Sequence, residues 1–301
     1  MTEMLPELDQ RVASALQVDG RAGPGRIAAA LRVSARTVTR SLSRIASAVR
    51  VVRVPDPRHG LPATTMLRIR VLRGRVEVIA DALARRPEVL FVDVLAGGEE
   101  ISTVVVGGRP ELPTGQAVTS VRAYSVMHVF SDAADWRTGL LTPEETAALT
   151  PPAPTLRLEP DELDTRMLAV LGTDARIGSA DLAAAVHAPE STVRRRLERL
   201  SVAGLLRTCV VADPRVFGLT VDANVWLTVP PGRLDDLGRR LATSPLVHGV
   251  LATTGETNLM AAVFCRDLPA LYEFVTGLHD VPAAEVTVVG GAVMRVGHRP
   301  G

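Results

Sequence analysis

The stretch Thr37-Val38-Thr39-Arg40-Ser41-Leu42-Ser43-Arg44 returns 155 residues later as Thr192-Val193-Arg194-Arg195-Arg196-Leu197-Glu198-Arg199. Outward from it, the same offset of 155 relates three other pairs of segments: Leu8-Asp9 with Leu163-Asp164, Asp19-x-Arg21 with Asp174-x-Arg176, and the alanine triplets at 28–30 and 183–185. Beyond them, Asp56-Pro57-Arg58 returns as Asp213-Pro214-Arg215 at an offset of 157, and Pro87 and Gly97 return as Pro245 and Gly255 at 158. Loop insertions produce such small changes of offset. The sequence therefore predicts two copies of one two-part unit.

The composition is that of a globular chain that does not enter a membrane. Its 301 residues, 47% of them hydrophobic, suffice for two or more domains of about 150 residues each. No apolar run approaches the ~20 residues that span a bilayer, and residues 1–8 lack a basic flank followed by an apolar stretch. We therefore expect a cytoplasmic protein with no membrane partner. Cys209 and Cys265 lie in apolar, strand-like runs without metal-ligand spacing, which predicts buried thiols, no metal site and no cofactor.

Charge is distributed unevenly between the two copies. The whole chain carries a net charge of only +1, and all 34 of its basic residues are arginine. Residues 8–54 contain nine arginines against two acids, a net charge of +7, whereas residues 163–213 contain seven arginines against six acids, a net charge of +1. The first copy is therefore the stronger candidate for binding a polyanion.

Each copy begins with three short predicted helices. In the first copy, residues 8–16 have the apolar spacing of one helix face, Asp19-Gly20 ends that helix, and Pro24 suits the first turn of the next one. The third helix is expected from Ala35 to Ala48. In the second copy we expect helices at Leu163–Leu171, Ser179–Val186 and Pro189–Val202, with Ser179 as an N-cap and Gly204 as a left-handed terminus.

The third helix of each copy leaves a basic, hydroxyl-bearing face outside. The residues on these faces are Arg36, Thr37, Thr39, Arg40 and Arg44 in the first copy, and Ser191, Thr192, Arg194, Arg195, Arg196 and Arg199 in the second. Such a helix fits the major groove, where arginine can bind guanine edges or phosphates, so we expect double-stranded DNA as a partner and these residues as its contacts. The alternative is the solvated face of an ordinary helical bundle. Occurrence of the pattern twice, each time before a β-rich segment such as Leu205–Val211, favours a winged helix-turn-helix.

The remainder of the second copy alternates between strands and helices. We expect strands at Val221–Val229, Val247–Thr253, Leu259–Cys265 and Val286–Val296, and helices at Leu234–Ala242 and Leu268–Leu278. This βαββαβ order is the ferredoxin-like plan. One face of such a sheet is covered by helices, and the other is apolar and must pair with something, most simply in a dimer.

The first copy follows the same order with one omission. Its expected elements are Thr65–Leu72, Val76–Ala84, Val89–Leu95 and Ile101–Val106. Only 12 positions then separate Val106 from Val118, and residues 107–113, rich in glycine and proline, cannot form a helix. The first copy is therefore predicted to lack its second helix.

These elements define an α+β fold of two tandem units, each a winged helix-turn-helix followed by a ferredoxin-like effector and dimerisation domain. The predicted boundaries are 1–55 and 161–212 for the two winged helix-turn-helix domains, 56–130 and 213–301 for the two ferredoxin-like domains, and 131–160 for a linker. Within the linker, Thr142-Pro143-Glu144-Glu145 predicts the start of a short helix. Trp136 is expected to anchor the linker on a neighbouring surface.

In order and spacing these motifs resemble the Lrp/AsnC (feast/famine) family of transcriptional regulators. The residues that carry the resemblance are Leu163-Asp164, Asp174-Ala175-Arg176, Ser191 to Leu197 with Leu200 and Gly204, Asp213-Pro214 with Gly218, and Thr254-Gly255 with Leu259. The resemblance covers essentially the whole chain, counted twice.

The resemblance implies a DNA-binding regulator that oligomerises and responds to a small molecule such as an amino acid. It maps effector binding to the turn Gly255, Glu256, Thr257 and Asn258, with Gly97 to Glu100 as the counterpart in the first copy. The family's turn often carries an aromatic residue and an aspartate after the glycine, which this chain lacks, so a plain hairpin is an equal alternative. Family chains usually contain one unit and often build octamers from dimers. A chain with two units resembles a covalent dimer and should assemble from fewer chains.

Two other interpretations remain open. Some related two-unit proteins resemble the sirohaem decarboxylases, which hold a tetrapyrrole with His and Arg, but this chain lacks the Arg-Arg-Phe-Gly-type run expected after the helices, and its six His are scattered singly. We therefore expect no catalytic residues. A binding protein that has lost DNA recognition in one half is the third interpretation. The basic run Arg194-Arg195-Arg196 argues against it, because a local patch suffices to neutralise phosphates.

Overall fold

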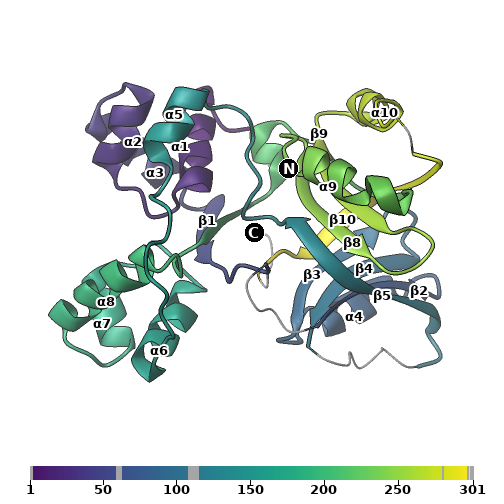
Figure 1. The fold of residues 1–301 in the computed structure, drawn as a ribbon, viewed down its shortest axis with the longest axis horizontal. Helices are drawn as coiled ribbons and strands as arrows, with labels where there is room; N and C mark the ends of the chain where they lie inside the picture. Colours follow the sequence, from purple (N-terminus) through teal and green to yellow (C-terminus); the bar gives the residue numbers. More distant parts are fainter. Residues whose placement is uncertain (1–2, 59–62, 108–114, 280, 297, 299–301) are drawn as a thin grey trace. The chain divides into compact units, whose positions relative to one another are not determined.

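The computed structural model describes residues 3–58, 63–107, 115–279, 281–296 and 298 (Figure 1). The chain divides into two compact units. The helical unit contains Leu5–Pro55 and Arg137–Ala212, and the barrel unit contains Met1–Met4, Asp56–Trp136 and Asp213–Gly301. Each unit is thus assembled from matching parts of both copies of the repeat.

Three helices of the first copy open the helical unit: α1 (Glu7–Val18), α2 (Pro24–Leu31) and α3 (Ala35–Ile45). Pro24 occupies the first turn of α2 as predicted. The side chain of Ser34 caps α3 by accepting a hydrogen bond from the Thr37 backbone N–H at 3.1 Å. The helix ends at Ile45, three residues before the predicted Ala48, because the chain turns there into a strand that begins at Val49.

The second copy supplies α6 (Glu162–Leu171), α7 (Ser179–Ala185) and α8 (Glu190–Val202). The turn before the third helix places Arg32 (φ 55°) and its counterpart His187 (φ 52°) in the left-handed region, again 155 residues apart. Gly204 follows α8 with φ 71°, as predicted. The prediction of Ser179 as an N-cap is wrong. Gly178 holds that position, and the Ser179 hydroxyl instead donates to Glu190 at 2.7 Å.

One strand from each copy and a further helix complete the helical unit. Strands β1 (Val49–Arg53) and β6 (Thr208–Ala212) pair with each other in an antiparallel two-stranded sheet. The predicted strand from Leu205 therefore starts later, and Leu205 itself packs into the core of the second helix group. Helix α5 (Pro143–Leu149) starts with the expected Thr142/Glu145 capping box and buries Leu149 completely. This part of the predicted linker is thus a packed helix of the unit.

The barrel unit contains four strands from each copy. The first copy supplies β2 (Thr64–Val71), α4 (Val76–Leu83), β3 (Val89–Leu95), β4 (Glu100–Val106) and β5 (Val118–Ser131). The second supplies β7 (Val221–Thr228), α9 (Leu234–Ala242), β8 (Val247–Thr253), β9 (Leu259–Cys265), α10 (Leu268–Thr276) and β10 (Ala283–Met294), the predicted βαββαβ order. The predicted absence of a second helix from the first copy concerns residues 108–114, which lie outside the described residues.

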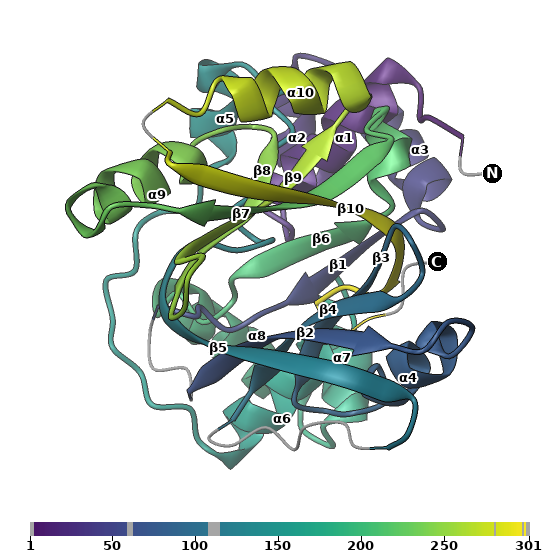
Figure 2. The same ribbon diagram turned by 90° about the vertical axis from the view of Figure 1, so that its right-hand side faces the viewer.

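The eight strands close into one barrel in the order β10-β3-β4-β2-β5-β8-β9-β7 (Figure 2). Two long strands make the closure possible, because each changes partner halfway. The first part of β5 pairs with β2 and its last part with β8, whereas β10 pairs first with β7 and then with β3. The apolar face that each half-sheet was expected to offer to a mate is therefore covered by the other half of the same chain.

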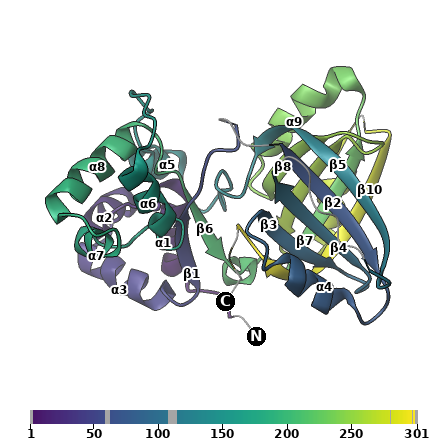
Figure 3. The same cartoon turned by 90° about the horizontal axis from the view of Figure 1, so that it is seen from below.

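Helices cover the outside of the barrel and apolar side chains fill part of its inside. Helix α4 packs on the strands of the first copy and α9 on those of the second (Figure 3), and α10 also packs on strands of the second copy. Inside, Met66, Val104, Trp226, Met260 and Ala262 form a cluster contributed by both halves. Burial of both sheet faces explains why β9 is buried at every position.

Several smaller predictions can be compared with the structure. Trp136 anchors its segment as expected, packing edge-on against Phe217 and Phe264 while its indole N–H donates to the Pro245 carbonyl at 2.9 Å. Cys209 and Cys265 are free and buried. Among the described residues, no helix combines the length and the apolar character that crossing a bilayer requires.

Candidate nucleic-acid interface and effector pocket

Helix α3 buries one face in the helical unit and exposes the other. Val38, Ser41 and Ile45 are buried. Of the five predicted DNA contacts on this helix, Arg36, Thr39, Arg40 and Arg44 are exposed and Thr37 is half-buried beside the capping Ser34. The arrangement leaves Arg36 and Arg40 one helical turn apart on the open face.

Helix α8 has the same arrangement with different side chains. Val193 and Leu200 are buried, and Ser191, Arg194, Arg195 and Arg199 are exposed. Arg194 makes a surface ion pair with Glu190 at 2.7 Å while its side chain stays 65% exposed. Thr192 and Arg196 are half-buried, so these two predicted contacts are less accessible than the others.

A buried aspartate on α1 holds α3 in place. Asp9 is 1% exposed, and it accepts hydrogen bonds from Arg44 (Nε 2.8 Å, Nη2 2.6 Å) and from the Ser41 hydroxyl (2.5 Å). The Arg44 hydrogen bond lowers the pKa of the Asp9 carboxyl against the opposing effect of burial, and the Ser41 hydrogen bond adds to it. Arg44, predicted as a DNA contact, therefore also fixes the orientation of the helix.

Asp164 on α6 has the same role for α8. It is 1% exposed and accepts a hydrogen bond from Arg196 at 2.9 Å, while Arg199 lies 3.8 Å away. Arg196 also donates to Asp161 at 2.6 Å and is only 18% exposed, so it links α8 to the start of α6. Neither aspartate was predicted to be functional. The signal was available, since both follow a leucine at the same place in the two copies.

The predicted effector turn lies between β8 and β9. Asn258 uses both ends of its amide on Val229, accepting from the backbone N–H and donating to the carbonyl at 2.8 Å each. Gly255 has φ 106°, and a Cβ there would lie 2.8 Å from Tyr124, so no other residue fits easily. Glu256 is exposed and Thr257 half-buried. The turn is a hairpin braced by Asn258, whose side-chain amide is already hydrogen-bonded to the backbone of Val229.

The corresponding turn of the first copy, Gly97 to Glu100, contributes to an ion-pair network of the barrel. Glu100 pairs with the buried Arg68 at 2.5 Å, and Arg68 also donates to Glu285 at 2.8 and 2.6 Å. The Arg68 guanidinium lies 4.8 Å from the centre of the Trp226 ring. Burial opposes the charge of Arg68, but the two glutamates reverse that effect and raise its pKa.

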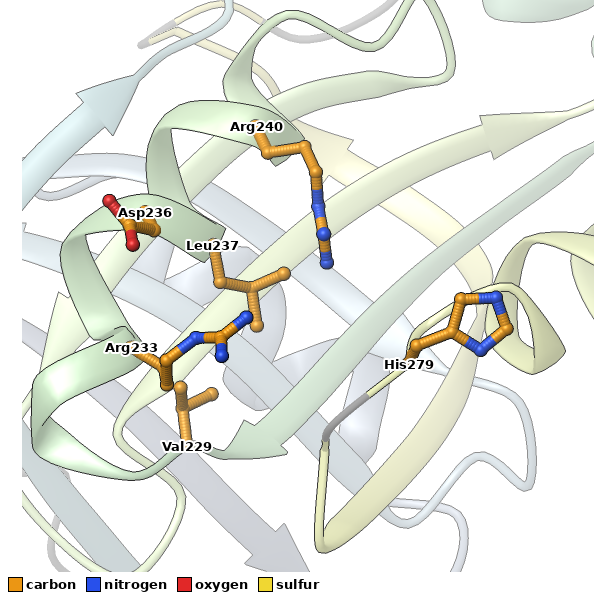
Figure 4. A pocket seen from close by; sticks show the side chains of 6 residues that line it. All are labelled: Val229, Arg233, Asp236, Leu237, Arg240 and His279. Carbon is orange, nitrogen blue, oxygen red and sulfur yellow. The ribbon is translucent and has the colours of Figure 1, made fainter.

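A pocket of about 260 Å³ opens beside the braced hairpin, at the start of α9 (Figure 4). Its walls carry three basic side chains, one acid and two apolar groups: Arg233, Arg240 and His279; Asp236; Val229 and Leu237. Val229, which lines the pocket, is hydrogen-bonded to Asn258, so the hairpin directly contacts a residue of the pocket wall. This mixture of groups can bind a small molecule that combines a carboxylate, an ammonium group and an apolar part.

An ionic cluster lies inside the barrel, where sequence analysis expected none. Half-buried Arg295 bridges Asp93 of β3 at 3.0 Å and Asp222 of β7, and His248 of β8 lies 3.5 Å from Asp222 and stacks on Phe264. Burial raises the pKa of Asp93 to about 7 although Arg295 opposes it. Burial also lowers the pKa of His248. For Asp222, Arg295 and His248 outweigh the effect of burial and lower the pKa. The position of Asp93 within the otherwise apolar strand Val89–Leu95 could have indicated this cluster.

Comparison with known proteins matches both kinds of domain in the second copy. The model of the AsnC-type helix-turn-helix domain matches residues 161–201, and that of the Lrp/AsnC ligand binding domain matches residues 222–289. The HTH-type transcriptional regulator AldR of Mycolicibacterium smegmatis is 30% identical over 119 residues, which are 38% of this chain and 70% of AldR. The HTH-type transcriptional regulator FL11 of Pyrococcus horikoshii is 23% identical over 133 residues, 44% of this chain and 88% of FL11. Each relative thus accounts for less than half of the chain.

Among solved structures, those of a siroheme decarboxylase resemble the chain over most of its length. The crystal structure of the siroheme decarboxylase NirDL covers 98% of this chain and 94% of its own, with a TM-score of 0.59 and 13% identity. At that identity the likeness is one of fold.

Proposed function

This chain belongs to the Lrp/AsnC family, and we propose that it is a sequence-specific DNA-binding transcriptional regulator modulated by a small molecule. The observation that carries the proposal is the pair of helices α3 and α8, each held by a buried aspartate with arginine and hydroxyl groups exposed on its outer face. Exposed arginines at this spacing suit base edges and phosphates of the major groove. We place the protein in the cytoplasm, where its DNA partner would be.

We also propose that the chain consists of two fused family units with the five-part division predicted above. The closed barrel and the β1–β6 sheet each join matching parts of the two copies, which supports equivalence of one chain to a dimer of single-unit chains. Assemblies of this protein should accordingly contain fewer than eight chains. Light scattering that found eight chains would contradict this.

The effector site is proposed to be the pocket beside the Gly255–Asn258 hairpin. An apolar amino acid would place its carboxylate near Arg240 and His279 and its side chain on Leu237. We expect one or more amino acids to change operator affinity, and Arg240→Ala to remove this response without changing affinity in its absence. Arg239→Ala, one residue away and paired with Asp235, is the control. A full response from Arg240→Ala would place the effector elsewhere.

The alternative function, a tetrapyrrole decarboxylase, is favoured by the full-length likeness of fold to NirDL. Such an enzyme needs cationic side chains free to hold the carboxylates of the substrate. Two arginines inside the barrel, buried Arg68 and half-buried Arg295, are already paired, the first with two glutamates and the second with two aspartates. This pairing favours the regulator, and we propose that the chain is not an enzyme.

One experiment separates the two functions. The purified chain is used to select genomic fragments at moderate salt with excess competitor DNA, and the absorbance spectrum of the same preparation is recorded. We expect enrichment of a few promoter fragments and no absorbance band of a tetrapyrrole. Absence of enrichment together with such a band would replace the proposal by the enzyme.

A further inference from the structure

We propose that one chain recognises a non-palindromic operator whose two half-sites differ in sequence, α3 binding one and α8 the other. The inference rests on the proposed function and goes beyond it, because it states what kind of DNA sequence the protein selects. Two features of the helical unit carry it: the two helix-turn-helix groups form one body, and their outward side chains are not the same.

Backbone pairing joins the two groups. Strands β1 and β6 run antiparallel, with Val51 opposite Val210, and the Ala175 N–H donates to the Val51 carbonyl at 2.8 Å. Gly20 fits tightly against this sheet, since a Cβ there would lie 2.5 Å from both Thr208 and Val51. The loop that ends α1 is therefore packed directly on the strand of the second copy.

The repeated Asp-x-Arg motif adds a reciprocal connection between the groups. Arg21 of the first copy donates to the Ala175 carbonyl, and Arg176 of the second donates to the carbonyls of Gly20 at 2.6 Å and Ala22 at 3.1 Å. Burial lowers the pKa of both guanidinium groups, and for Arg21 the charge of Arg176 adds to this effect. Two arginines held this way, one from each copy, leave the two groups little freedom to separate. A single chain thus supplies a fixed pair of recognition helices.

The two helices share two outward arginines, Arg40 with Arg195 and Arg44 with Arg199, and differ at other exposed positions. At the offset of 155, Arg40 corresponds to Arg195, and both are exposed. Three further exposed positions differ between the copies: Arg36 corresponds to Ser191, Thr39 to Arg194, and Ser43 to Glu198. Arg36, Ser43, Ser191 and Glu198 lie three or four residues from Arg40 or Arg195 on the same open face, whereas Thr39 and Arg194 are the exposed residues directly before these two arginines.

Each difference changes which base edge can be bound. An arginine binds guanine through two hydrogen bonds, a glutamate accepts from the amino group of cytosine, and a threonine methyl contacts the methyl of thymine. Thr39 already donates its hydroxyl to the Ala35 carbonyl at 3.0 Å, which leaves its methyl for such a contact. Arg194 gives up only a surface ion pair with Glu190 when it turns to DNA. The half-sites should share the base bound by Arg40 and Arg195 and differ beside it.

The symmetry of the two recognition helices determines the symmetry of the operator. A dimer of identical chains carries two identical recognition helices, so its operator mirrors the two-fold axis as a palindrome. In this chain the helices are unlike and cannot exchange places, because both belong to one polypeptide. Its preferred operator therefore has a direction, and the protein binds it in one orientation.

The test is selection of binding sites from a random double-stranded DNA library. We expect the unmodified chain to select a motif with two unlike half-sites. A first variant, Arg36→Ser with Thr39→Arg and Ser43→Glu, gives α3 the outward side chains of α8. It should select a palindrome built from the α8 half-site and bind it at least about tenfold more tightly than the original operator. The reciprocal variant, Ser191→Arg with Arg194→Thr and Glu198→Ser, should select a palindrome of the α3 half-site.

All six substituted positions are exposed, so thermal unfolding should change little, and Arg266→Ser, exposed on the barrel unit, should leave the motif unchanged. A palindromic motif from the unmodified chain, or an unchanged motif from both variants, overturns the inference while leaving DNA binding intact. No enrichment from any of the four proteins contradicts the proposed function itself, and the inference falls with it.

Discussion

Replacing Arg40 and Arg195 together with alanine is expected to weaken operator binding by about 2 to 6 kcal/mol, that is, by about thirtyfold or more. Each is an exposed residue at the same position of its helix, and neither forms an ion pair among the described residues. A base-contacting arginine contributes about 1 to 3 kcal/mol, and contacts on two separate helices should add. Fluorescence anisotropy at one fixed salt concentration measures the loss, because phosphate contacts make every affinity depend on salt.

Two comparisons make this result specific to base contact. The double variant should unfold at the same urea concentration as the unmodified chain, since both side chains are exposed. Arg196→Ala should instead lower stability, because it leaves buried Asp164 without its nearest cation. Unchanged affinity in the Arg40/Arg195 variant would remove α3 and α8 from the DNA interface.

Replacing Arg295 with methionine is expected to lower the free energy of unfolding at pH 8 by about 3 to 5 kcal/mol. Arg295 lies between Asp93 and Asp222 inside the barrel, and its removal leaves the buried carboxylate of Asp93 and the half-buried carboxylate of Asp222 without this cation. At pH 5 the loss should be smaller, because protonation neutralises Asp93. Urea unfolding at both pH values measures it. An equal loss at the two pH values would show that packing, not charge, is the cause.

The second variant for this cluster is Asp93→Asn. In the folded chain the pKa of Asp93 is raised from 3.8 to about 7, so the folded state holds a proton that the unfolded state has released. The associated stability is complete below about pH 4 and is lost as the pH rises through about 7. Asparagine carries no such proton, so Asp93→Asn should be about 2 to 4 kcal/mol more stable than the unmodified chain at pH 8 and similar to it below pH 4.

His248 contributes in the opposite direction, since its pKa is lowered and its stabilisation is lost as the pH falls below about 6.5. Because His248 is present in both the unmodified chain and Asp93→Asn, its contribution largely cancels in the difference between their free energies of unfolding. Asp181→Asn, at an exposed position of α7, is the control and should be within about 0.5 kcal/mol of the unmodified chain at pH 8. If Asp93→Asn were less stable at pH 8, the ionised carboxylate would be a net stabiliser of the barrel.

Local elements followed closely from the sequence. The predicted bounds of β3, β8, β9 and α9 agree with the structure to the residue. Apolar periodicity and turn residues fix such elements within one stretch of chain. The eleven predicted DNA contacts all lie on α3 or α8, and eight are exposed. Whether they contact DNA remains a prediction that the arginine variants test.

Features that depend on residues distant in the chain could not be predicted from the sequence. Strand β5 continues to Ser131 and β10 starts at Ala283, because each pairs with a second strand from the other copy. Arg44 and Arg196 were assigned only to DNA, since periodicity cannot show that Asp9 and Asp164 lie buried beside them. A charged residue on a helix face has the same spacing whether it meets solvent or a neighbouring carboxylate.

The sequence by itself determined the duplication, the helices and most of the strands, because an offset of 155 and a period of two or 3.6 residues are properties of the chain alone. Tertiary structure decided how the copies combine. Arg295 lies between Asp93 and Asp222, and eight strands form one barrel. Arg21 and Arg176 each donate to a backbone carbonyl of the other copy. The physical reason is burial. Only the folded chain removes these charges and strand edges from water, and their partners are then whatever the other copy places within hydrogen-bonding distance.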